Sequence, residues 1–340
     1  MGVKQFIKQS ILHGAETFGG NRFFRWKTRK NLLGLCYHGV IGDEAPWDDP
    51  RARIAVSATQ FELQMKELHS HWKPISLAEL DECFQSGRPI PKNSVFVSFD
   101  DGFLNNLTIA APILRRYEIP ATVFLTTGLI GTENTIWPLE LLERVVQWNG
   151  DELPAIESLP NTHVPKDAMS RREFAMKIVD HCKTLPVVEC QKIVERFRKK
   201  SEFRLAHRWQ EELYRMLDWN SVRTLLDCGV EIGAHTVSHC NLAQITVLDA
   251  EEELRQSKQE IEKNLGNDCY SLAYPFGDPG AFNDSVVETA RNLGFRIGTT
   301  LCLRRNPLVP DPLRLDRLCV TGDLSLASFR SLISGWRNIY

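Results

Sequence analysis

The sequence predicts an α/β fold in which parallel strands alternate with helices, either as an open sheet or closed into a barrel. Apolar runs typical of buried strands alternate with amphipathic stretches typical of helices over residues 31–136 and again over 220–340. Parallel neighbours need a long crossover connection, usually a helix, and this alternation supplies it. A length of 340 residues with 43% hydrophobic content is enough for one large α/β domain or two small ones.

The expected strands are short apolar runs, several of which end in polar residues. In chain order they cover residues 31–40, 95–99, 119–131, 229–235, 269–277 and 295–300, and residues 73–84 hold a further short strand followed by a helix. The other expected helices carry their apolar residues on one face and cover residues 57–72, with Ser57 or Thr59 near the start, 107–117, 247–265 and 283–293. We expect functional groups at the carboxyl ends of the strands.

The alternation stops between Trp137 and Trp219. This region is largely charged and helical, with "RREFAMKIVDHC" and "VVECQKIVERFRKK" as amphipathic stretches. We therefore expect residues 137–219 to be a helical insertion, or cap, in a domain formed by residues 31–136 and 220–340. A substrate lid, a partner surface and a dimer contact all remain open as its role.

Composition excludes several classes of protein. The net charge is −2, and no basic cluster with interleaved aromatic residues is present, so no nucleic-acid partner is expected. The nine cysteines are scattered and none forms a C-x-x-C pair, which argues against a zinc ribbon and against a disulfide framework. A reducing compartment fits this pattern best.

Residues 1–30 form a basic segment with a single acid, Glu16. No apolar core follows the first lysines, so a secretory signal peptide is not expected, and no run is long enough to span a membrane. We expect Phe6, Ile7, Ile11, Leu12 and Phe18 to form one apolar face of a basic helix. Such a helix would either bind anionic lipid as a peripheral contact or pack against its own domain.

Polar groups close four of the expected strands. His38 closes the first, the pair Asp100 and Asp101 in "SFDDG" closes another, His235 a later one, and "YPFG" the next. Adjacent residues of a strand point to opposite faces, so the two carboxylates could serve two tasks. The alternatives are an ordinary Asp-Gly turn and a hydrogen-bonded core histidine at position 38.

His235 and His239 frame the segment "HTVSH". Two histidines four residues apart can face one site if the backbone turns helically between them, although most such pairs bind nothing. Two imidazoles and one carboxylate form a common catalytic zinc set with a position open for water. The same set suits ferrous iron, so the ligands alone do not select the metal.

The motifs "SFDDG", "HTVSH" and "YPFG", in this order, resemble those of the polysaccharide deacetylase family, the NodB-homology enzymes of carbohydrate esterase family 4. The resemblance runs from about Leu32 to Val320 and is interrupted by the insertion. It implies a distorted (β/α)7 barrel of the NodB type with a helical insertion. It also implies metal-dependent removal of N-acetyl, sometimes O-acetyl, groups from sugars.

Carried onto this chain, the resemblance makes Asp100 the catalytic base and Asp101, His235 and His239 the metal ligands. The backbone N–H of Phe276 in "YPFG" would stabilise the oxyanion. The expected cofactor is a divalent metal, Zn²⁺ in the first place, with Co²⁺, Ni²⁺ or Fe²⁺ as alternatives. Such a metal lowers the pKa of water to roughly 7 and polarises the carbonyl oxygen.

The sequence departs from the usual family pattern in two places. The C-terminal leucine-x-histidine motif is absent from "PLRLDRLCV", and Ala273 stands where the third motif usually begins with arginine. One branch, which resembles the poly-N-acetylglucosamine deacetylases, carries its acid histidine in an N-terminal "YH" strand. "LCYHGV" matches that arrangement, so the resemblance makes His38 the general acid and suggests that Arg317 pairs with Asp100. An aspartate that orients His38 is expected, but its position is not assigned.

The function expected from the sequence is an N-deacetylase of an amino sugar in a polysaccharide, an oligosaccharide or a lipid-linked precursor, with a sugar nucleotide as a further alternative. The competing interpretations are a degenerate carbohydrate-binding protein and a deacylase of a non-sugar amide. Aromatic residues that could stack on a sugar are Trp47, Phe103, Trp137 and Phe276. The expected location is the cytoplasm, with peripheral contact at the inner membrane face and a role in cell-surface polysaccharide assembly.

Overall fold

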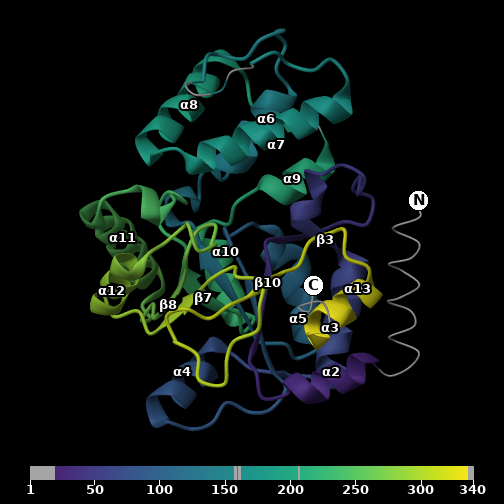
Figure 1. The fold of residues 1–340 in the computed structure, drawn as a ribbon, viewed down its shortest axis with the longest axis vertical. Helices are drawn as coiled ribbons and strands as arrows, with labels where there is room; N and C mark the ends of the chain where they lie inside the picture. The colour runs from purple at the N-terminus through teal and green to yellow at the C-terminus, as the bar shows by residue number, and fades with distance from the viewer. Residues whose placement is uncertain (1–19, 157–158, 160–161, 206, 336–340) are drawn as a thin grey trace.

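The computed structural model describes residues 20–156, 159, 162–205 and 207–335, and it contains a curled parallel sheet surrounded by helices (Figure 1). The strand order is β10-β1-β5-β6-β7-β8-β9, and β4 pairs with β5 outside this path. The strands are β1 (Leu33–Tyr37), β4 (Lys73–Pro74), β5 (Ser94–Phe99), β6 (Ala121–Leu125), β7 (Glu231–Ala234), β8 (Ser271–Ala273), β9 (Ile297–Thr299) and β10 (Leu318–Cys319). Two further strands, β2 (Gly39–Ile41) and β3 (Ala55–Ser57), form a small parallel sheet.

The segment that leads into β10 brings the two edges of the sheet together. Leu315 pairs with Thr299 of β9, and three residues later Leu318 pairs with Leu35 of β1. The central strands β1 and β5 are buried at every residue, as expected of parallel strands covered on both faces. The expected distorted barrel of parallel strands is therefore confirmed, with a weak closure made by very short strands.

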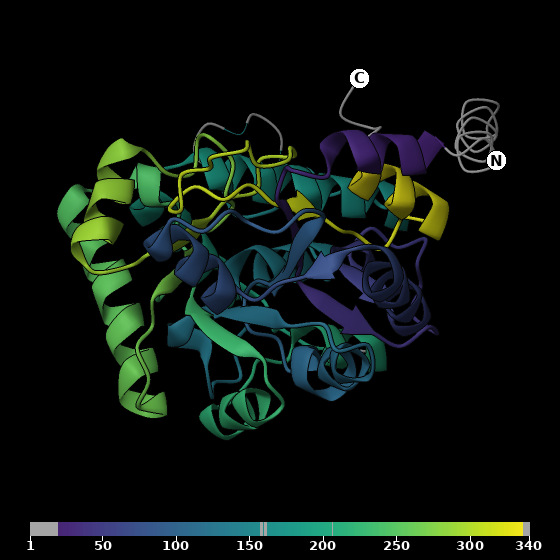
Figure 2. The ribbon, with the colours of Figure 1, turned by 90° about the horizontal axis from the view of Figure 1, so that it is seen from below.

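Most helices lie around the barrel, as Figure 2 shows from below. They are α2 (Gly20–Thr28), α3 (Ala58–His71), α4 (Leu77–Ser86), α5 (Ala111–Arg116), α10 (Trp219–Asp227), α11 (Val247–Leu265), α12 (Asp284–Asn292) and α13 (Leu326–Ser334), with short turns η1 (Ala52–Ile54), η3 (Thr127–Leu129) and η4 (Leu242–Gln244). The Ser57 side chain caps α3 by accepting a hydrogen bond from the Gln60 N–H. The helix expected over 107–117 begins instead as a π-helical turn, η2 (Asn106–Ala110).

Four helices from the region expected to be an insertion lie together on one side of the barrel: α6 (Trp137–Val146), α7 (Ala168–Thr184), α8 (Val187–Lys200) and α9 (Arg208–Tyr214) (Figure 1). Their buried apolar residues form a cluster of their own that also takes in residues of the 41–55 segment, such as Ile41 and Ala52. Whether residues 137–219 form a separate domain stays a prediction.

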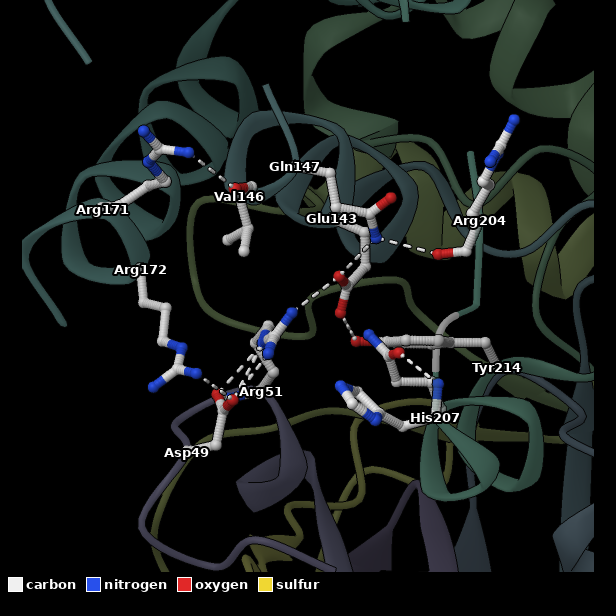
Figure 3. A network of polar contacts seen from close by, with 11 residues as sticks. Asp49, Arg51, Glu143, Val146, Gln147, Arg171, Arg172, Arg204, His207 and Tyr214 are labelled. Carbon is white, nitrogen blue, oxygen red and sulfur yellow. Dashed lines mark hydrogen bonds and ion pairs between the residues drawn. The ribbon is translucent and has the colours of Figure 1, made fainter. Parts of the chain in front are cut away.

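A buried polar network joins these helices to the segment before β3 (Figure 3). Arg51 binds both carboxylate oxygens of Asp49, and its Nη1 lies 2.7 Å from Oε2 of Glu143 in α6. The Tyr214 hydroxyl donates to the other oxygen of Glu143 over 2.7 Å, and Arg172 of α7 lies 3.2 Å from Asp49. Because the charges of Arg51, Asp49 and Glu143 are buried and paired with one another, they hold α6 and α7 in place above the barrel.

The expected apolar face formed by Phe6, Ile7, Ile11, Leu12 and Phe18 lies outside the described residues. Helix α2, which does belong to them, leaves Phe23 and Trp26 58% and 59% exposed. None of the helices among the described residues has the length and apolar character that crossing a bilayer requires.

Candidate metal and catalytic site

Asp100 and Asp101 follow the last residue of β5, and both line the same hollow at the carboxyl ends of the strands. The expectation that they point to opposite faces of a strand is therefore wrong. Asp101 has a φ of +76°, and Gly102 after it has +89°, so the strand geometry ends at Phe99 and the alternation of strand side chains does not extend to Asp101. The Asp-Gly turn and the paired carboxylates are one and the same feature.

His235 and His239 follow β7 and reach the same hollow. The segment from Thr236 to His239 is not the helical turn that the spacing suggested, because φ is +64° at Thr236 and +56° at His239. Nε2 of His235 lies 3.5 Å from Oδ1 of Asp101, and Nε2 of His239 lies 3.2 Å from the same oxygen. One ligand atom from each of the three residues lies within 4.8 Å of the other two.

The environment of these three side chains suits a divalent cation. Both oxygens of the buried Asp101 carboxylate lack a hydrogen-bond donor among the described residues. Nδ1 of His235 donates to the carbonyl of Ala273 over 2.8 Å, which leaves Nε2 as an acceptor aimed at Asp101. A buried carboxylate without donors and an imidazole oriented through its other nitrogen are what a metal site requires.

The pKa shifts agree with this assignment. Burial raises the pKa of Asp101, but the adjacent His235 and His239 outweigh it and hold that pKa well below its usual range. Burial lowers the pKa of His239 and outweighs the attraction of Asp101. The carboxylate is thus ionised and the His239 imidazole neutral, which are the forms that bind metals.

Backbone strain is concentrated at the site. Among the described residues other than glycine, a positive φ occurs at Asn93, Asp101, Glu118, Thr236, His239 and Phe276. All but Asn93 and Glu118 belong to the three motifs that close the strands. Such conformations cost about 1–3 kcal/mol each and persist where the surrounding structure enforces them, typically at functional sites.

Arg317 precedes β10 and forms a bidentate ion pair with Asp100. The two N···O distances are 2.7 and 2.8 Å, and Arg317 also donates to the hydroxyl of Ser98 and to the carbonyl of Thr300. Burial raises the pKa of Asp100, but Arg317 outweighs it and the net shift is downward. The Asp100 carboxylate is therefore ionised and held in one orientation.

His38 follows β1 and lines the hollow. One of its polar atoms lies within 4.8 Å of the thiol of Cys36 and of the carboxylate of Asp100. Burial lowers the pKa of His38, but contact with Cys319 and the charges of Asp101 and Asp100 outweigh it and raise the pKa to about 9. The neighbour that does most to raise the pKa of His38 is thus Cys319 of β10, and the aspartate that was expected to orient His38 stays unassigned.

Two asparagines that the sequence analysis missed hold the backbone on either side of Gly39. Asn106 donates from its amide to the carbonyl of His38 over 3.0 Å, and Oδ1 of Asn105 accepts from the N–H of Val40 over 2.9 Å. Both are buried, and they lie at the start of the π-helical turn η2 that precedes α5. A pair of asparagines soon after "FDDG" is the only sequence signal for this role.

The four candidate aromatic residues take different positions. Phe276 lines the hollow, with its ring centre 4.9 Å from that of His239 and 6.2 Å from that of Trp137. Among the described residues, no group accepts a hydrogen bond from the Phe276 N–H. Trp137 borders a neighbouring cavity. Phe103 is buried in the core, and neither Phe103 nor Trp47 lines the hollow, so Phe276 is the one of the four candidates that does.

The hollow itself has a volume of about 240 Å³. Its floor consists of the carboxylates and imidazoles described above. Its walls are mostly apolar and include Met176 and Val179 of α7 together with Ile136 and Leu139. Asp180 and Lys183, also from α7, are the polar exceptions on that side.

The barrel and the order of its motifs define the class of NodB-type deacetylase barrels. The sequence profile of the family described as "Polysaccharide deacetylase" matches residues 87–298, well over half of the chain. The chain belongs to the polysaccharide deacetylase family.

Individual relatives agree with this family and with the expected branch. The poly-beta-1,6-N-acetyl-D-glucosamine N-deacetylase of Staphylococcus aureus is 44% identical over 81 residues, which are 24% of this chain and only 28% of that protein. The Streptococcus pyogenes deacetylase PplD, solved in complex with acetate, superposes with a TM-score of 0.58 over 89% of this chain and 98% of its own, at 17% identity. IcaB from Ammonifex degensii gives a TM-score of 0.56 over 89% and 97%, at 19% identity.

Proposed function

We propose that this protein is a metal-dependent deacetylase that hydrolyses the N-acetyl group of an amino sugar. The observation that carries the proposal is the convergence of Asp101, His235 and His239 on one point, with the ionised Asp100 beside them. Membership of the polysaccharide deacetylase family and the activity named for the S. aureus relative support the reaction class.

Asp101, His235 and His239 would hold the metal, with Zn²⁺ proposed in the first place and Co²⁺, Ni²⁺ or Fe²⁺ as alternatives, because one carboxylate and two imidazoles suit all of them. When bound, a divalent cation supplies Lewis acidity that activates water and polarises the carbonyl of the acetyl group. The low pKa of Asp101 and the neutral imidazole of His239 keep this set ready for a cation at neutral pH.

The remaining groups handle protons and charge. Asp100 accepts a proton from the attacking water, and Arg317 keeps Asp100 ionised and oriented. The N–H of Phe276 donates to the carbonyl oxygen as negative charge develops there. His38 donates a proton to the leaving amine as the C–N bond breaks, so that the products are acetate and a free amino sugar.

The substrate class follows from the family and remains an N-acetylated sugar in a polysaccharide, an oligosaccharide or a lipid-linked precursor. The exposed Phe23 and Trp26 of α2 lie beside Arg22, Lys27 and other cations, a combination that favours anionic lipid surfaces. All nine cysteines are free thiols, as expected in a reducing compartment. We therefore place the protein in the cytoplasm, in peripheral contact with the membrane.

The membrane contact is tested by sedimentation with vesicles. Wild-type protein should bind vesicles that contain phosphatidylglycerol and not pure phosphatidylcholine vesicles, and replacing Trp26 by Ala should weaken binding. The matched control is Trp148→Ala, because Trp148 packs on Phe197 far from α2 in the sequence. Equal binding of wild type and Trp26→Ala would contradict this contact.

A degenerate binding protein is the second candidate function, favoured by Ala273 where the family usually has arginine. Arg317 weakens that alternative, because it supplies a guanidinium to Asp100 from the segment before β10. The discriminating experiment measures acetate release from chitooligosaccharides after loading with Zn²⁺. Release that stops on chelation and returns with Zn²⁺ supports the deacetylase. Tight sugar binding without release supports the degenerate alternative, and release from simple N-acyl amides alone would point to a non-sugar substrate.

A further inference from the structure

We propose that a second cavity, next to the catalytic hollow, binds a hydrocarbon chain attached to the sugar, so that the substrate is an N-acetylated amino sugar with an apolar aglycone. The inference rests on the proposed deacetylase function and adds the substrate class to it.

The cavity has a volume of about 630 Å³ and lies between the helices α7 and α8 and two loops of the barrel. Those loops are residues 128–129, after β6, and 237–241, which contain the second histidine of the metal set. The wall is predominantly apolar and includes Leu129, Trp137, Leu185, Val187, Val188 and Val194. A cavity of this size falls within the roughly 300–1,000 Å³ typical of small-molecule sites.

The cavity and the catalytic hollow share a wall formed by residues 135–138. Thr135 and Trp137 line the cavity, whereas Ile136 and Pro138, which alternate with them, line the hollow. On the barrel side, the Trp137 indole donates to the carbonyl of His239 over 3.2 Å. The wall therefore includes a residue of the proposed metal set.

Lys183 lines both spaces and marks the place where they meet. Its Nζ lies 5.9 Å from the ring centre of Phe276, the residue whose N–H faces no acceptor among the described residues. The two spaces are therefore adjacent at Lys183, and the proposal requires that a ligand in the hollow extend past this side chain into the cavity. The acetamido group of an N-acetyl sugar sits on the carbon next to the anomeric carbon, so a sugar with its acetamido group at the catalytic residues would have its anomeric substituent within a few bonds of them.

The charges around the cavity argue for an apolar chain and against a run of further sugars or an anion. The four charged residues of its lining, Lys183, Lys192, Glu195 and Arg198, all have ion-pair partners: Asp180, Glu189, Lys199 and Glu140 respectively. No charge of the lining is left over for a ligand. The hollow, at about 240 Å³, is smaller than typical sites and holds little beyond the reacting sugar.

The apolar surface of the cavity also reaches the outside of the protein. Val188, on α8, is 60% exposed at its rim. An apolar chain that enters there would cover this side chain and leave the sugar at the catalytic groups. Helix α2 precedes the amino end of β1, whereas the site lies at the carboxyl ends of the strands. The cavity would therefore bind such a chain at the end of the barrel opposite α2 (Figure 1).

The test compares octyl and methyl N-acetyl-β-D-glucosaminide, both below the critical micelle concentration, as substrates of the Zn²⁺-loaded protein. Burial of several methylene groups should raise kcat/KM for the octyl glycoside about tenfold or more over the methyl glycoside. Val188→Asp should reduce this octyl-to-methyl ratio by about fivefold or more. The matched control is Met169→Asp on α7, because Met169 is 52% exposed but does not line the cavity, and it should leave the ratio unchanged.

Calorimetric titration of the Asp100→Asn variant with the two glycosides gives the same comparison without turnover. An octyl preference in binding that Val188→Asp removes would support the cavity even if no acetate were released, in which case only the proposed function would fail. Equal affinity and equal kcat/KM for the two glycosides, or an octyl preference that Val188→Asp leaves intact, would overturn the inference.

Discussion

Arg317 and Asp100 form a bidentate ion pair in the interior of the barrel, although 217 residues separate them in the sequence. Both side chains are buried, and Ser98 and Thr300 accept the remaining hydrogen bonds of the guanidinium. The pair explains how the chain functions without an arginine at position 273. The Arg317 guanidinium binds the proposed base, Asp100, from the segment before β10. At position 273 in β8, the backbone carbonyl of Ala273 accepts a hydrogen bond from Nδ1 of His235 and so orients that imidazole.

Replacing Arg317 by Met should lower the free energy of unfolding by about 3–5 kcal/mol, because it leaves the Asp100 carboxylate buried without its counter-charge. Urea unfolding measured at pH 7 tests this. The matched control is Arg88→Met, since Arg88 pairs with Glu82 on the surface and its loss should cost less than about 1 kcal/mol. Similar losses in the two variants would contradict the role of the buried pair.

Asp100→Asn should lower kcat by about 10²–10⁴-fold, because an amide cannot accept the proton of the attacking water. Bound metal should be retained, since the proposed ligands are Asp101 and the two histidines. Acetate release and metal content measured on the same sample separate these effects. A variant that loses its metal together with its activity would place Asp100 among the ligands.

The activity should fall at alkaline pH as His38 loses its proton, because a general acid works only in its protonated form. The pKa of His38 is raised from its ordinary 6.5 to about 9, partly by the charge of Asp101. A bound cation neutralises that charge, so we expect the midpoint of the falling limb between 6.5 and 9. In a pH–rate profile His38→Gln should lose this limb while it keeps its metal, and an unchanged limb would exclude His38 as the acid.

The same shift has a consequence for stability in the metal-free protein. Since folding raises the pKa of His38, its contribution to stability is fully present below pH 6.5 and is lost as the pH rises through about 9. Thermal unfolding of wild type and His38→Gln in the presence of a chelator should therefore differ most at pH 6 and converge above pH 9. A constant difference across this range would contradict the raised pKa.

The strand positions followed from the sequence because a parallel sheet covered on both faces produces continuous apolar runs. The runs at 31–40, 95–99 and 229–235 all contain observed strands. The pair β2 and β3 was missed, since each strand has only three residues. Strands this short are determined by tertiary packing and not by local propensity.

The sequence predicted which residues form the site better than it predicted how their side chains are oriented. The residues that close the strands, such as Asp100 and His235, do come together, because carboxyl ends of parallel strands share one edge. Their directions were not predictable, since the left-handed φ of Asp101 is enforced by the surrounding fold. The contacts made by Asn106 and Cys319 join residues far apart in the chain, and apart from the asparagine pair soon after "FDDG" one sequence carries no signal for them.

Tyr214→Phe should lower the free energy of unfolding by about 1–3 kcal/mol, because Oε1 of the buried Glu143 would lose its donor in the network that holds α6 and α7 (Figure 3). Chemical denaturation provides the measurement. Tyr270→Phe is the matched control, since the buried Tyr270 hydroxyl has no hydrogen-bond partner among the described residues. Equal stabilities of the two variants would show that the network contributes little.

The central claim is that Asp101, His235 and His239 hold one divalent ion, and metal content measured by mass spectrometry after dialysis against Zn²⁺ tests it most directly. We expect about one ion per folded chain in wild type and in Asp100→Asn, and about a hundredfold weaker binding in Asp101→Ala, His235→Ala and His239→Ala. Wild-type protein that binds no ion, or folded alanine variants that bind it as tightly as wild type, would contradict the claim.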